Sequence, residues 1–451
     1  MTSAALLPLP DDYGLLTDLY QLTMASCYAG EGIADRWASF ELFTRRLPTG
    51  YGYLVAMGLA QAVDYLSNLR FSAAHLAALR QTGLFDQAPA AFWQRLETGG
   101  FTGDLWAVPE GTAVFAQEPL LRVEAPLWQA QLVETYLLNT LNYQTLIASR
   151  AARLRDVAGP GTRLLEFGAR RAFSPQGALW AARAALAGGL DETSNVLAAV
   201  QLGRRPAGTM AHALVMAFTA LEGSEDEAFE AFERYFPGAA LLIDTYDPVA
   251  AAARLAQRPV PVTAVRLDSG DLVALSREVR SHLPQATIFA SGDLDEFEIA
   301  RLKAAGAPID GYGLGTKLVT GDPVNGVYKL VDLDGLPVMK ESAQKATLPG
   351  RKQVFRRYRD GQAAGDRLGL ATEAPAPGEV PLLERVMHRG QVVKPADSLE
   401  TIRDRTTAAV VSLPPAVRQL HQPTDYPVEQ SASLVELTAQ TRHRPGVHPL
   451  P

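Results

Sequence analysis

The spacing of apolar and polar positions changes along the chain near residue 160. Before this point, residues 15–24 mix apolar and polar positions as a helix does, and residues 38–43 alternate like a strand. Residues 127–156 predict one long helix. After Gly159-Pro160-Gly161, short continuous apolar runs alternate with helical stretches, and each run ends in glycine or charged residues. The clear runs of this kind span residues 163–171, 241–247, 264–271, 288–295 and 309–317.

Continuous apolar runs separated by helices indicate parallel strands that are buried on both faces. Polar residues at the carboxyl ends of successive strands are typical of a β/α barrel, whose active site lies on that rim. A doubly wound open sheet is the alternative, because it also places its ligands at the carboxyl ends of strands. Several polar strand ends in one region favour the barrel. We therefore predict an α/β protein with an irregular, TIM-like β/α barrel.

The length of 451 residues exceeds that of one ordinary domain. We expect an N-terminal α+β domain over residues 13–158 and the barrel over residues 159–335. Beyond the barrel the pattern weakens, and residues 336–440 are expected to pack back and complete the N-terminal domain. Residues 1–12 and 441–451 are expected to be flexible ends.

Composition narrows the class of protein. Hydrophobic residues make up 47% and charged residues 20%, as in soluble globular proteins. A net charge of −7 argues against a general binder of nucleic acid or membrane surfaces. Cys27 is the single cysteine, so no intrachain disulfide can form, and no Cys/His cluster has zinc-site spacing. The chain has no apolar run of about 20 residues and no signal-peptide pattern, so a cytoplasmic location is expected.

One short segment, Gly208-Thr209-Met210-Ala211-His212, precedes an apolar run over residues 213–218. Thr209 is a candidate N-cap, and the glycine allows the backbone to approach a ligand closely. His212 would then lie in the first helical turn, near free N–H groups that attract anions. The structural alternative is a capped core helix that carries one buried histidine.

The other strand ends also have structural interpretations. Asp244 and Asp247 could cap the helix that follows them, and the glycine-rich residues 311–316 lack both the dinucleotide fingerprint and the P-loop spacing. On a barrel, however, these ends share one rim. The polar residues that would meet near His212 there are Arg170, Arg266, Asp268, Asp293, Thr316 and Lys317. Arginines bind phosphates and clustered aspartates bind Mg²⁺, so the pattern predicts a phosphorylated sugar as substrate, together with a divalent metal.

The motifs of this chain resemble those of the nicotinate phosphoribosyltransferases, which have the type II phosphoribosyltransferase fold. The resemblance runs from about residue 13 to residue 435 in unbroken order. The matching segments are residues 16–24, 166–171, 194–198, 208–212, 265–272, 313–316, 327–331 and 345–350.

The resemblance implies that nicotinate and 5-phosphoribosyl 1-pyrophosphate give nicotinate mononucleotide and pyrophosphate in NAD salvage, with ATP as co-substrate and Mg²⁺ as cofactor. It makes His212 the residue that ATP phosphorylates. It also implies that Tyr20 and Thr209 bind nicotinate and that Phe167 covers the other face of the ring. Tyr20 would come from the partner subunit of a homodimer whose active sites lie at the interface.

Further roles are implied for the sugar phosphate. Arg266 and Thr316 would contact 5-phosphoribosyl 1-pyrophosphate, and Gly292 and Gly315 are counted among the substrate-binding residues. Asp268 follows Arg266 by two residues and so lies on the same side of the strand end, where we assign it to the ribose hydroxyls or to Mg²⁺.

Two assignments are not narrowed to a single residue with a single role. Either Arg170 or Arg171 could pair with the carboxylate of nicotinate or with the 5′-phosphate. Lys345 belongs to a polar stretch over residues 340–352 that we expect to close over the nucleotide. We assign no residue as a direct metal ligand.

Competing functions remain at this point. A sibling enzyme that uses nicotinamide or quinolinate is the nearest alternative. A lyase or aldolase would need a Schiff-base lysine inside the barrel, for which Lys303, Lys317 and Lys329 are the candidates. A non-catalytic relative would show decay of the rim residues, which the sequence does not show. A type I phosphoribosyltransferase is disfavoured, because no apolar strand ends in paired acidic residues followed by its usual threonine and glycine.

Overall fold

The computed structural model describes residues 8–342 and 345–444, with the side chains of residues 342, 345 and 346 also left out. The chain forms two compact units, Met1–Leu146 with Pro323–Pro451, and Ile147–Asp322. The divisions therefore fall before the expected positions at 158/159 and 335/336. The first of them lies inside one continuous helix, α6 (Glu134–Ala158), and a division within a helix leaves no signal in the sequence.

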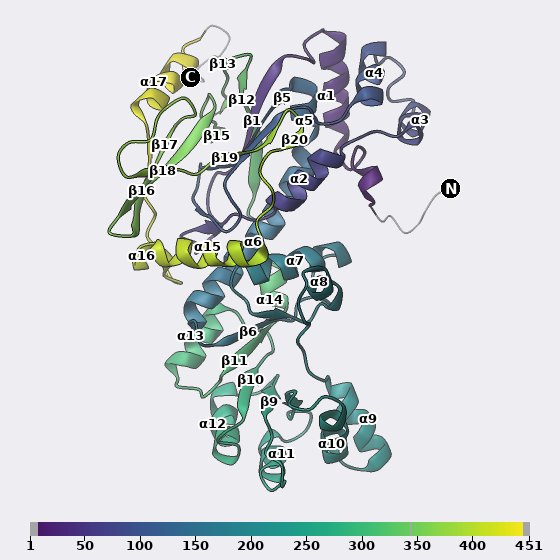
Figure 1. The fold of residues 1–451 in the computed structure, drawn as a ribbon, viewed down its shortest axis with the longest axis vertical. Helices are drawn as coiled ribbons and strands as arrows, with labels where there is room; N and C mark the ends of the chain where they lie inside the picture. Colours follow the sequence, from purple (N-terminus) through teal and green to yellow (C-terminus); the bar gives the residue numbers. More distant parts are fainter. Residues whose placement is uncertain (1–7, 343–344, 445–451) are drawn as a thin grey trace. The chain divides into compact units, whose positions relative to one another are not determined.

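The first unit is built on an antiparallel sheet with the strand order β13-β12-β1-β5-β3-β19-β20 (Figure 1). Its neighbouring strands β1 and β5 are buried over almost their whole length and pair with each other from Trp37 to Phe43. The strands of this sheet are β1 (Trp37–Thr44), β3 (Asp104–Ala107), β5 (Pro119–Pro126), β12 (Gly326–Leu333), β13 (Leu336–Pro337), β19 (Glu384–His388) and β20 (Gln391–Val392).

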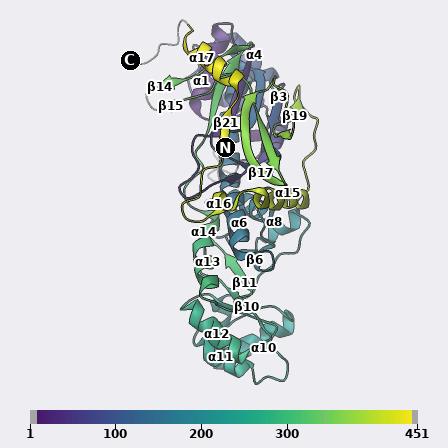
Figure 2. The ribbon, with the colours of Figure 1, turned by 90° about the vertical axis from the view of Figure 1, so that its left-hand side faces the viewer.

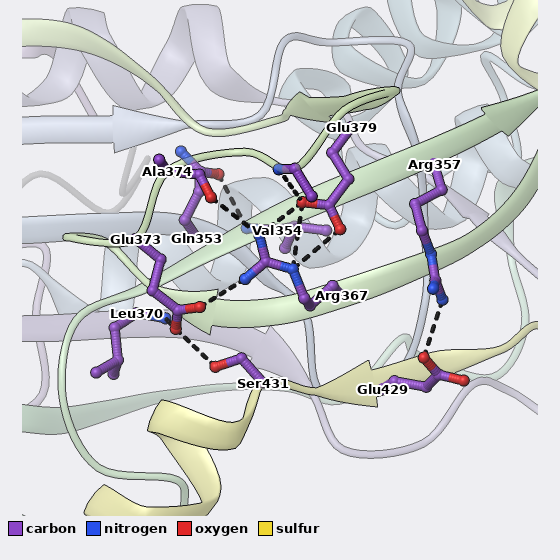
Figure 3. A network of polar contacts seen from close by, with 11 residues as sticks. Gln353, Val354, Arg357, Arg367, Leu370, Glu373, Ala374, Glu379, Glu429 and Ser431 are labelled. Atoms are coloured by element: carbon purple, nitrogen blue, oxygen red, sulfur yellow. Dashed lines mark hydrogen bonds and ion pairs between the residues drawn. The ribbon is translucent and has the colours of Figure 1, made fainter.

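A second sheet of this unit has the order β18-β16-β17-β21, and two short hairpins, β2-β4 and β14-β15, accompany it. These strands are β16 (Lys352–Arg359), β17 (Gln362–Leu370), β18 (Glu379–Pro381), β21 (Val428–Gln430), β2 (Leu54–Val55), β4 (Ala113–Val114), β14 (Glu341–Ser342) and β15 (Lys345–Ala346). Figure 3 shows Arg367 of β17 between Glu373 and Glu379, with Ser431 donating to Glu373. The carboxylates thus join β17, the turn after it, β18 and the start of α17.

The helices of the first unit differ from the sequence expectation in two places. The prediction of one continuous helix over residues 127–156 is wrong, because α5 ends at Leu132, Val133 is its C-cap, and α6 begins at Glu134. Helix α17 continues to Arg442, inside the segment expected to be flexible, while residues 1–7 and 445–451 of the expected flexible ends lie outside the described residues. The helical segments, besides the start of α6, are η1 (Pro10–Asp12), α1 (Leu19–Gly30), α2 (Leu59–Asn68), α3 (Ala73–Gln81), α4 (Ala90–Thr98), α5 (Leu127–Leu132), α15 (Leu399–Ser412), α16 (Pro415–Arg418) and α17 (Ala432–Arg442).

The second unit contains a six-stranded parallel sheet in the order β7-β6-β11-β10-β9-β8. Its strands are β6 (Arg163–Glu166), β7 (Glu192–Thr193), β8 (Leu241–Leu242), β9 (Ala264–Leu267), β10 (Thr287–Ala290) and β11 (Gly311–Leu314). Every apolar run singled out in the sequence contains all or most of one of these strands. The prediction of parallel strands separated by helices is therefore confirmed.

Helices connect these strands, and aspartates begin several of them. Asp247, Asp271 and Asp295 accept hydrogen bonds from backbone N–H groups at the starts of α11, α12 and α13. Figures 1 and 2 show these three helices following one another alongside the strands. Besides the end of α6, the helices of this unit are α7 (Pro175–Ala187), α8 (Val196–Gln201), α9 (His212–Glu222), α10 (Glu225–Tyr235), α11 (Pro248–Leu255), α12 (Leu272–His282), α13 (Glu296–Ala304) and α14 (Thr316–Val319). Within residues 8–342 and 345–444, no helix combines the length and the apolar character that a membrane crossing requires.

The parallel sheet is not a closed barrel in the described residues. Its edge strands β7 and β8 do not pair with each other, so the hydrogen-bonded ladder is open. Residues 207–209 nevertheless span the gap between the two edges: the Ala207 N–H donates to the Thr193 carbonyl of β7 at 2.9 Å. The Thr209 hydroxyl donates to the carbonyl of Ala240, just before β8, at 2.6 Å. One irregular segment thus contacts the chain at both edges of the open sheet.

Candidate active site

One face of the parallel sheet borders a cavity of about 180 Å³. Every second residue of β6, β9 and β10 lines it, as the alternation of side chains along a strand requires. The opposite wall is formed by residues 207–209 and 238–240. The strand residues that line it are Arg163, Leu165 and Phe167 near β6, Glu192 of β7, Ala264 and Arg266 of β9, Thr287 and Phe289 of β10, and Gly313 of β11.

Gly313 makes room for an aromatic ring at the carboxyl end of this cavity. A Cβ at residue 313 would lie 2.6 Å from two ring carbons of Phe167, closer than any side chain tolerates. The Phe167 N–H donates to the carbonyl of Leu314, which fixes the backbone at the end of β6. The half-buried Phe167 ring therefore rests on the glycine strand with a defined position and leaves a flat apolar surface at the cavity.

His212 is the first residue of α9, in the first turn as expected. The prediction that Thr209 caps this helix is wrong: the N-cap is Ala211, which makes no side-chain cap, and the Thr209 hydroxyl is bound to Ala240 instead. The imidazole is not buried either, since 40% of the side chain is exposed. Its Nδ1 lies 3.0 Å from the Thr245 hydroxyl, and its Nε2 lies 3.9 Å from Asp268 Oδ2. The alternative of a buried core histidine is thus excluded.

Asp268 stands at the carboxyl end of β9, facing His212. Its Oδ1 accepts a hydrogen bond from the Ser291 hydroxyl at 2.5 Å, and its backbone N–H donates to Asp244 Oδ2 at 2.7 Å. Asp244 therefore does not act as the helix cap proposed from the sequence, although Asp247 does. Gly292, with φ +94°, lies so close to this turn that a Cβ there would be 2.1 Å from the Asp268 carbonyl oxygen. Gly292 is thus required for the packing of the turn, rather than for flexibility.

Arg266 lies between the backbone just before His212 and the Phe167 ring. Its guanidinium donates to the Met210 carbonyl at 3.3 Å, lies 3.6 Å from Asp268 Oδ1, and stands 6.0 Å from the centre of the Phe167 ring. Burial lowers the pKa of Arg266, the nearby Arg170 lowers it further, and the carboxylates of Asp268 and Asp244 act in the opposite sense. Its Nε is buried and makes no hydrogen bond. This cation is therefore held in place with less than its full set of acceptors.

The side chain of Glu166 holds the turn after β6 in place. The buried carboxylate accepts hydrogen bonds from the Gly168 N–H and from the Thr193 hydroxyl. Burial raises the pKa of Glu166, and these two donors oppose that rise. Arg170 and Arg171 follow in the same turn, where both are exposed. The influence of Arg170 on Arg266 brings Arg170 into the cluster, but the side-chain contacts do not decide which arginine meets a carboxylate or a phosphate.

The end of β11 carries further candidates. Gly315 immediately precedes α14, and a Cβ there would be 3.6 Å from the Phe167 carbonyl oxygen, so the two turns adjoin. Thr316 is the first residue of α14 and is half-buried. Lys317 pairs with Asp295 at 2.8 Å, and Asp293 acts on its charge from nearby. Lys317 is thus held by an aspartate of the adjacent turn.

Two candidates belong to the first unit. Tyr20 lies near the start of α1 with 48% of its surface exposed, and its hydroxyl donates to Glu134 at 3.4 Å. Burial and the charge of Glu134 raise the pKa of Tyr20. Lys345 begins β15, but its side chain and residues 343–344 lie outside the described residues. The closure of this loop therefore stays a prediction.

None of the lysines named for Schiff-base chemistry lines the cavity. Lys303 donates to the carbonyls of Val157 and Ala158, where it stabilises the carboxyl end of α6. Lys317 is paired with Asp295, and Lys329 lies in β12 of the first unit, 3.8 Å from Glu134. A lyase or aldolase mechanism thus lacks its nucleophile among the candidate lysines.

Three polar residues at this site were not recognised from the sequence as partners of the chemistry. The Thr245 hydroxyl shares a hydrogen bond with His212, and the Ser291 hydroxyl donates one to Asp268. Asp244 accepts the Asp268 N–H and so holds the turn after β9. A signal for them existed, because each lies directly at the end of an apolar run. Hydroxyl residues at strand ends are common, however, and only the contacts distinguish these.

Three segments of the chain match models of one protein family. Residues 15–142 match the model of the nicotinate phosphoribosyltransferase N-terminal domain, residues 162–290 match the nicotinate phosphoribosyltransferase family, and residues 379–438 match the C-terminal domain. A nicotinate phosphoribosyltransferase of Mycobacterium tuberculosis is 43% identical over 446 residues, covering 95% of this chain and 94% of its own length. The human nicotinate phosphoribosyltransferase is 34% identical, with 94% of this chain and 95% of its own length covered.

The fold agrees with these relatives. The crystal structure of human nicotinic acid phosphoribosyltransferase superposes with a TM-score of 0.81 at 32% identity, covering 94% of this chain and 99% of that one. A nicotinate-nucleotide pyrophosphorylase from Pyrococcus furiosus has the same fold, with a TM-score of 0.76 at 24% identity over 91% of this chain and 99% of that one. With nearly full coverage in both sequence and structure, the chain belongs to the nicotinate phosphoribosyltransferase family.

Proposed function

We propose that this chain is an ATP-dependent nicotinate phosphoribosyltransferase of NAD salvage. It transfers the phosphoribosyl group of 5-phosphoribosyl 1-pyrophosphate to the ring nitrogen of nicotinate and releases pyrophosphate. The observation that carries the proposal is the arrangement of Arg266 between the Phe167 ring, the Asp268 carboxylate and the backbone before His212. Family membership makes nicotinate the first substrate to test.

The aromatic surface and the cations suit the two substrates. Phe167 offers a flat face for the pyridine ring, and Thr209 lines the same cavity, although its hydroxyl proton is already donated to Ala240. Arg266 supplies positive charge where the carboxylate of nicotinate and the phosphates of the sugar meet. As pyrophosphate leaves, positive charge develops on the ribose, so positioning and charge complementarity carry most of the catalysis.

Asp268, Gly292, Gly315 and Thr316 provide the sugar-phosphate side of the site in this proposal. Asp268 leaves one carboxylate oxygen toward solvent, where the ribose hydroxyls can donate to it. The glycine turns bring backbone N–H groups to the carboxyl ends of β10 and β11, and Thr316 opens the short helix beyond. Arg170 or Arg171 completes the binding of a carboxylate or phosphate.

Mg²⁺ fits this set of donors as a substrate-bound ion. No group of three or more His, Cys, Asp or Glu side chains in the described part of the chain could hold a metal alone. Asp244 has a buried Oδ1 without a hydrogen bond, and Asp268 keeps Oδ2 available. One or two carboxylates with pyrophosphate oxygens are the usual setting for Mg²⁺, which would neutralise the leaving group.

ATP coupling is assigned to His212. The exposed imidazole at the first position of α9 can accept the γ-phosphoryl group of ATP, releasing ADP, and the helix start favours the added negative charge. Water later cleaves the phosphohistidine to inorganic phosphate during the cycle of nicotinate turnover. This coupling places the reaction among the ATP-dependent ligases.

A homodimer completes the proposed site. Tyr20 is exposed, and α8 presents the apolar side chains of Val196, Leu197 and Val200 to solvent, which a second copy would cover. The partner's Tyr20 then covers the nicotinate ring opposite Phe167.

Residues 207–209 act in this proposal as the irregular strand that closes the parallel sheet into a barrel.

Labelling with γ-³²P-ATP tests the proposal most directly. We expect acid-labile, base-stable label on the wild-type protein and none on His212→Ala, while His282→Ala, an exposed histidine at the end of α12, keeps it. Turnover is then compared for nicotinate, nicotinamide and quinolinate, with and without ATP. Preference for nicotinamide or quinolinate refutes the assignment of nicotinate as the substrate. An unlabelled wild-type protein refutes the phosphohistidine intermediate.

A further inference from the structure

The two carboxylate oxygens of Asp268 have different surroundings. Oδ1 accepts from the Ser291 hydroxyl and lies 3.6 Å from the Arg266 guanidinium. Oδ2 faces His212 Nε2 at 3.9 Å, too far for a hydrogen bond, and 34% of the side chain is exposed. One oxygen is therefore engaged by the protein and the other is offered outward.

The backbone of Asp268 is already fixed without the side chain of Ser291. Its N–H donates to Asp244 Oδ2, and Ser269 donates its hydroxyl to the same oxygen at 2.9 Å. The close approach of Gly292 to the Asp268 carbonyl leaves no space for the turn to shift. What these contacts leave free is rotation of the carboxylate about its last torsion, which has only a broad preference.

Ser291 is built to restrain that rotation. It follows β10 directly and is 4% exposed, and its N–H donates to the Leu267 carbonyl of the neighbouring strand at 2.9 Å. Its hydroxyl has one proton to donate, and Asp268 Oδ1 receives it. Without this donor, the carboxylate could turn both oxygens toward Arg266, the nearest cation, and withdraw Oδ2 from the site.

We propose that Ser291 is a positioning residue that holds the Asp268 carboxylate so that Oδ2 stays available to the hydroxyls of a phosphorylated ribose. This inference rests on the proposed function, because it assigns the ribose of 5-phosphoribosyl 1-pyrophosphate to Asp268. Ser291 itself acts through Asp268 and needs no contact with the substrate.

Steady-state kinetics of Ser291→Ala test this role. The substitution removes one oxygen atom and leaves the backbone contacts in place. We expect the KM for 5-phosphoribosyl 1-pyrophosphate to rise about tenfold, as for loss of one hydrogen bond to a charged group, with kcat and the KM for nicotinate within about twofold of wild type. Calorimetric titration with 5-phosphoribosyl 1-pyrophosphate and Mg²⁺ alone should show the same loss of affinity.

A double-mutant cycle with Asp268→Ala separates positioning from a general structural effect. In the Asp268→Ala background, Ser291→Ala should have no further effect on that KM, because the carboxylate that accepts its hydrogen bond is gone. Ser276→Ala is the matched control, since this buried serine donates its hydroxyl to Val273 inside α12. It should leave both KM values unchanged.

The possible failures are distinguishable. A wild-type protein that does not turn over nicotinate refutes the proposed function. Normal turnover with an unchanged KM in Ser291→Ala, equal losses for both substrates, or additive effects in the double mutant would each overturn the role of Ser291 alone.

Discussion

The two units treat their buried arginines differently. In the first unit, Arg356 and Asp366 are 2% and 0% exposed and form two parallel hydrogen bonds, from Nε and Nη2, to the carboxylate. The Tyr426 hydroxyl donates to the same carboxylate. In the second unit, Arg266 is 14% exposed, stands 3.6 Å from the Asp268 carboxylate and leaves its Nε without an acceptor.

This difference separates charges that hold a fold from charges that await a ligand. A buried ion pair with complete hydrogen bonding compensates its own desolvation, whereas an incompletely paired cation costs stability until a ligand supplies the missing acceptors. Arg266 should therefore matter for binding and catalysis, and Arg356 for stability. Substitutions at the two positions can test that division.

The largest expected effect is on stability, at Arg356. Arg356→Met leaves Asp366 buried without its cation and should lower the free energy of unfolding by about 3–5 kcal/mol, measured by urea denaturation. The double substitution Arg356→Met/Asp366→Leu removes both charges and should recover much of this loss. A single variant as stable as wild type would contradict the comparison.

Arg266→Met should have the opposite profile. We expect kcat/KM for nicotinate to fall by about 10²- to 10³-fold, because the site loses the cation nearest to Phe167 and Asp268. The melting temperature should stay equal or rise, since the desolvated and incompletely paired charge is gone. A falling melting temperature would assign Arg266 to the fold instead.

The sequence predicted these two regions unequally. The parallel strands at 163–166 and 264–267 were recognisable, because continuous apolar runs with polar ends have few other interpretations. The break at Val133 and the division within α6 were not, since local propensity there favours an uninterrupted helix.

The candidate site shows the same limit. His212, Arg266 and Asp268 were recognised from motif and spacing, and the structure brings them together. The role of the Thr209 hydroxyl was predicted wrongly, because its acceptor at Ala240 is 31 residues away in the sequence. Ser291 was missed for the same reason: its partner lies 23 residues earlier and becomes a neighbour only when β9 and β10 pair.

Glu118 sharpens the comparison through pH. It lies beside Asp366, the partner of Arg356 in the first unit, and burial, followed by the charge of Asp366, raises the pKa of Glu118 well above its usual value. The folded state therefore keeps the Glu118 proton at a pH where the unfolded chain releases it. Below the ordinary pKa of a glutamate this residue costs nothing, and above it stability is lost as the pH rises toward the raised value.

Glu118→Gln should remove that loss, because an amide can donate to Asp366 and accept from the Phe115 N–H without ionising. We expect the variant to match wild type near pH 4 and to exceed its melting temperature at pH 7 to 8, with a flatter pH dependence. A parallel pair of curves would show that Glu118 is already ionised in the folded protein.

The smallest expected effect concerns an ion pair of the same sheet. Figure 3 shows Arg357 reaching toward Glu429, close to the Arg367 network. The two groups lie 3.0 Å apart, but the side chains of Arg357 and Glu429 are 41% and 67% exposed. Water competes for both groups, so Arg357→Ala should change the free energy of unfolding by at most about 1 kcal/mol. Arg367→Ala is the internal control: it removes hydrogen bonds to Glu373 and the nearly buried Glu379, and it should cost about 2 kcal/mol or more. Equal effects at the two arginines, measured in the same urea titrations, would mean that neither the burial of these charges nor the number of their contacts determines how strongly they hold the fold.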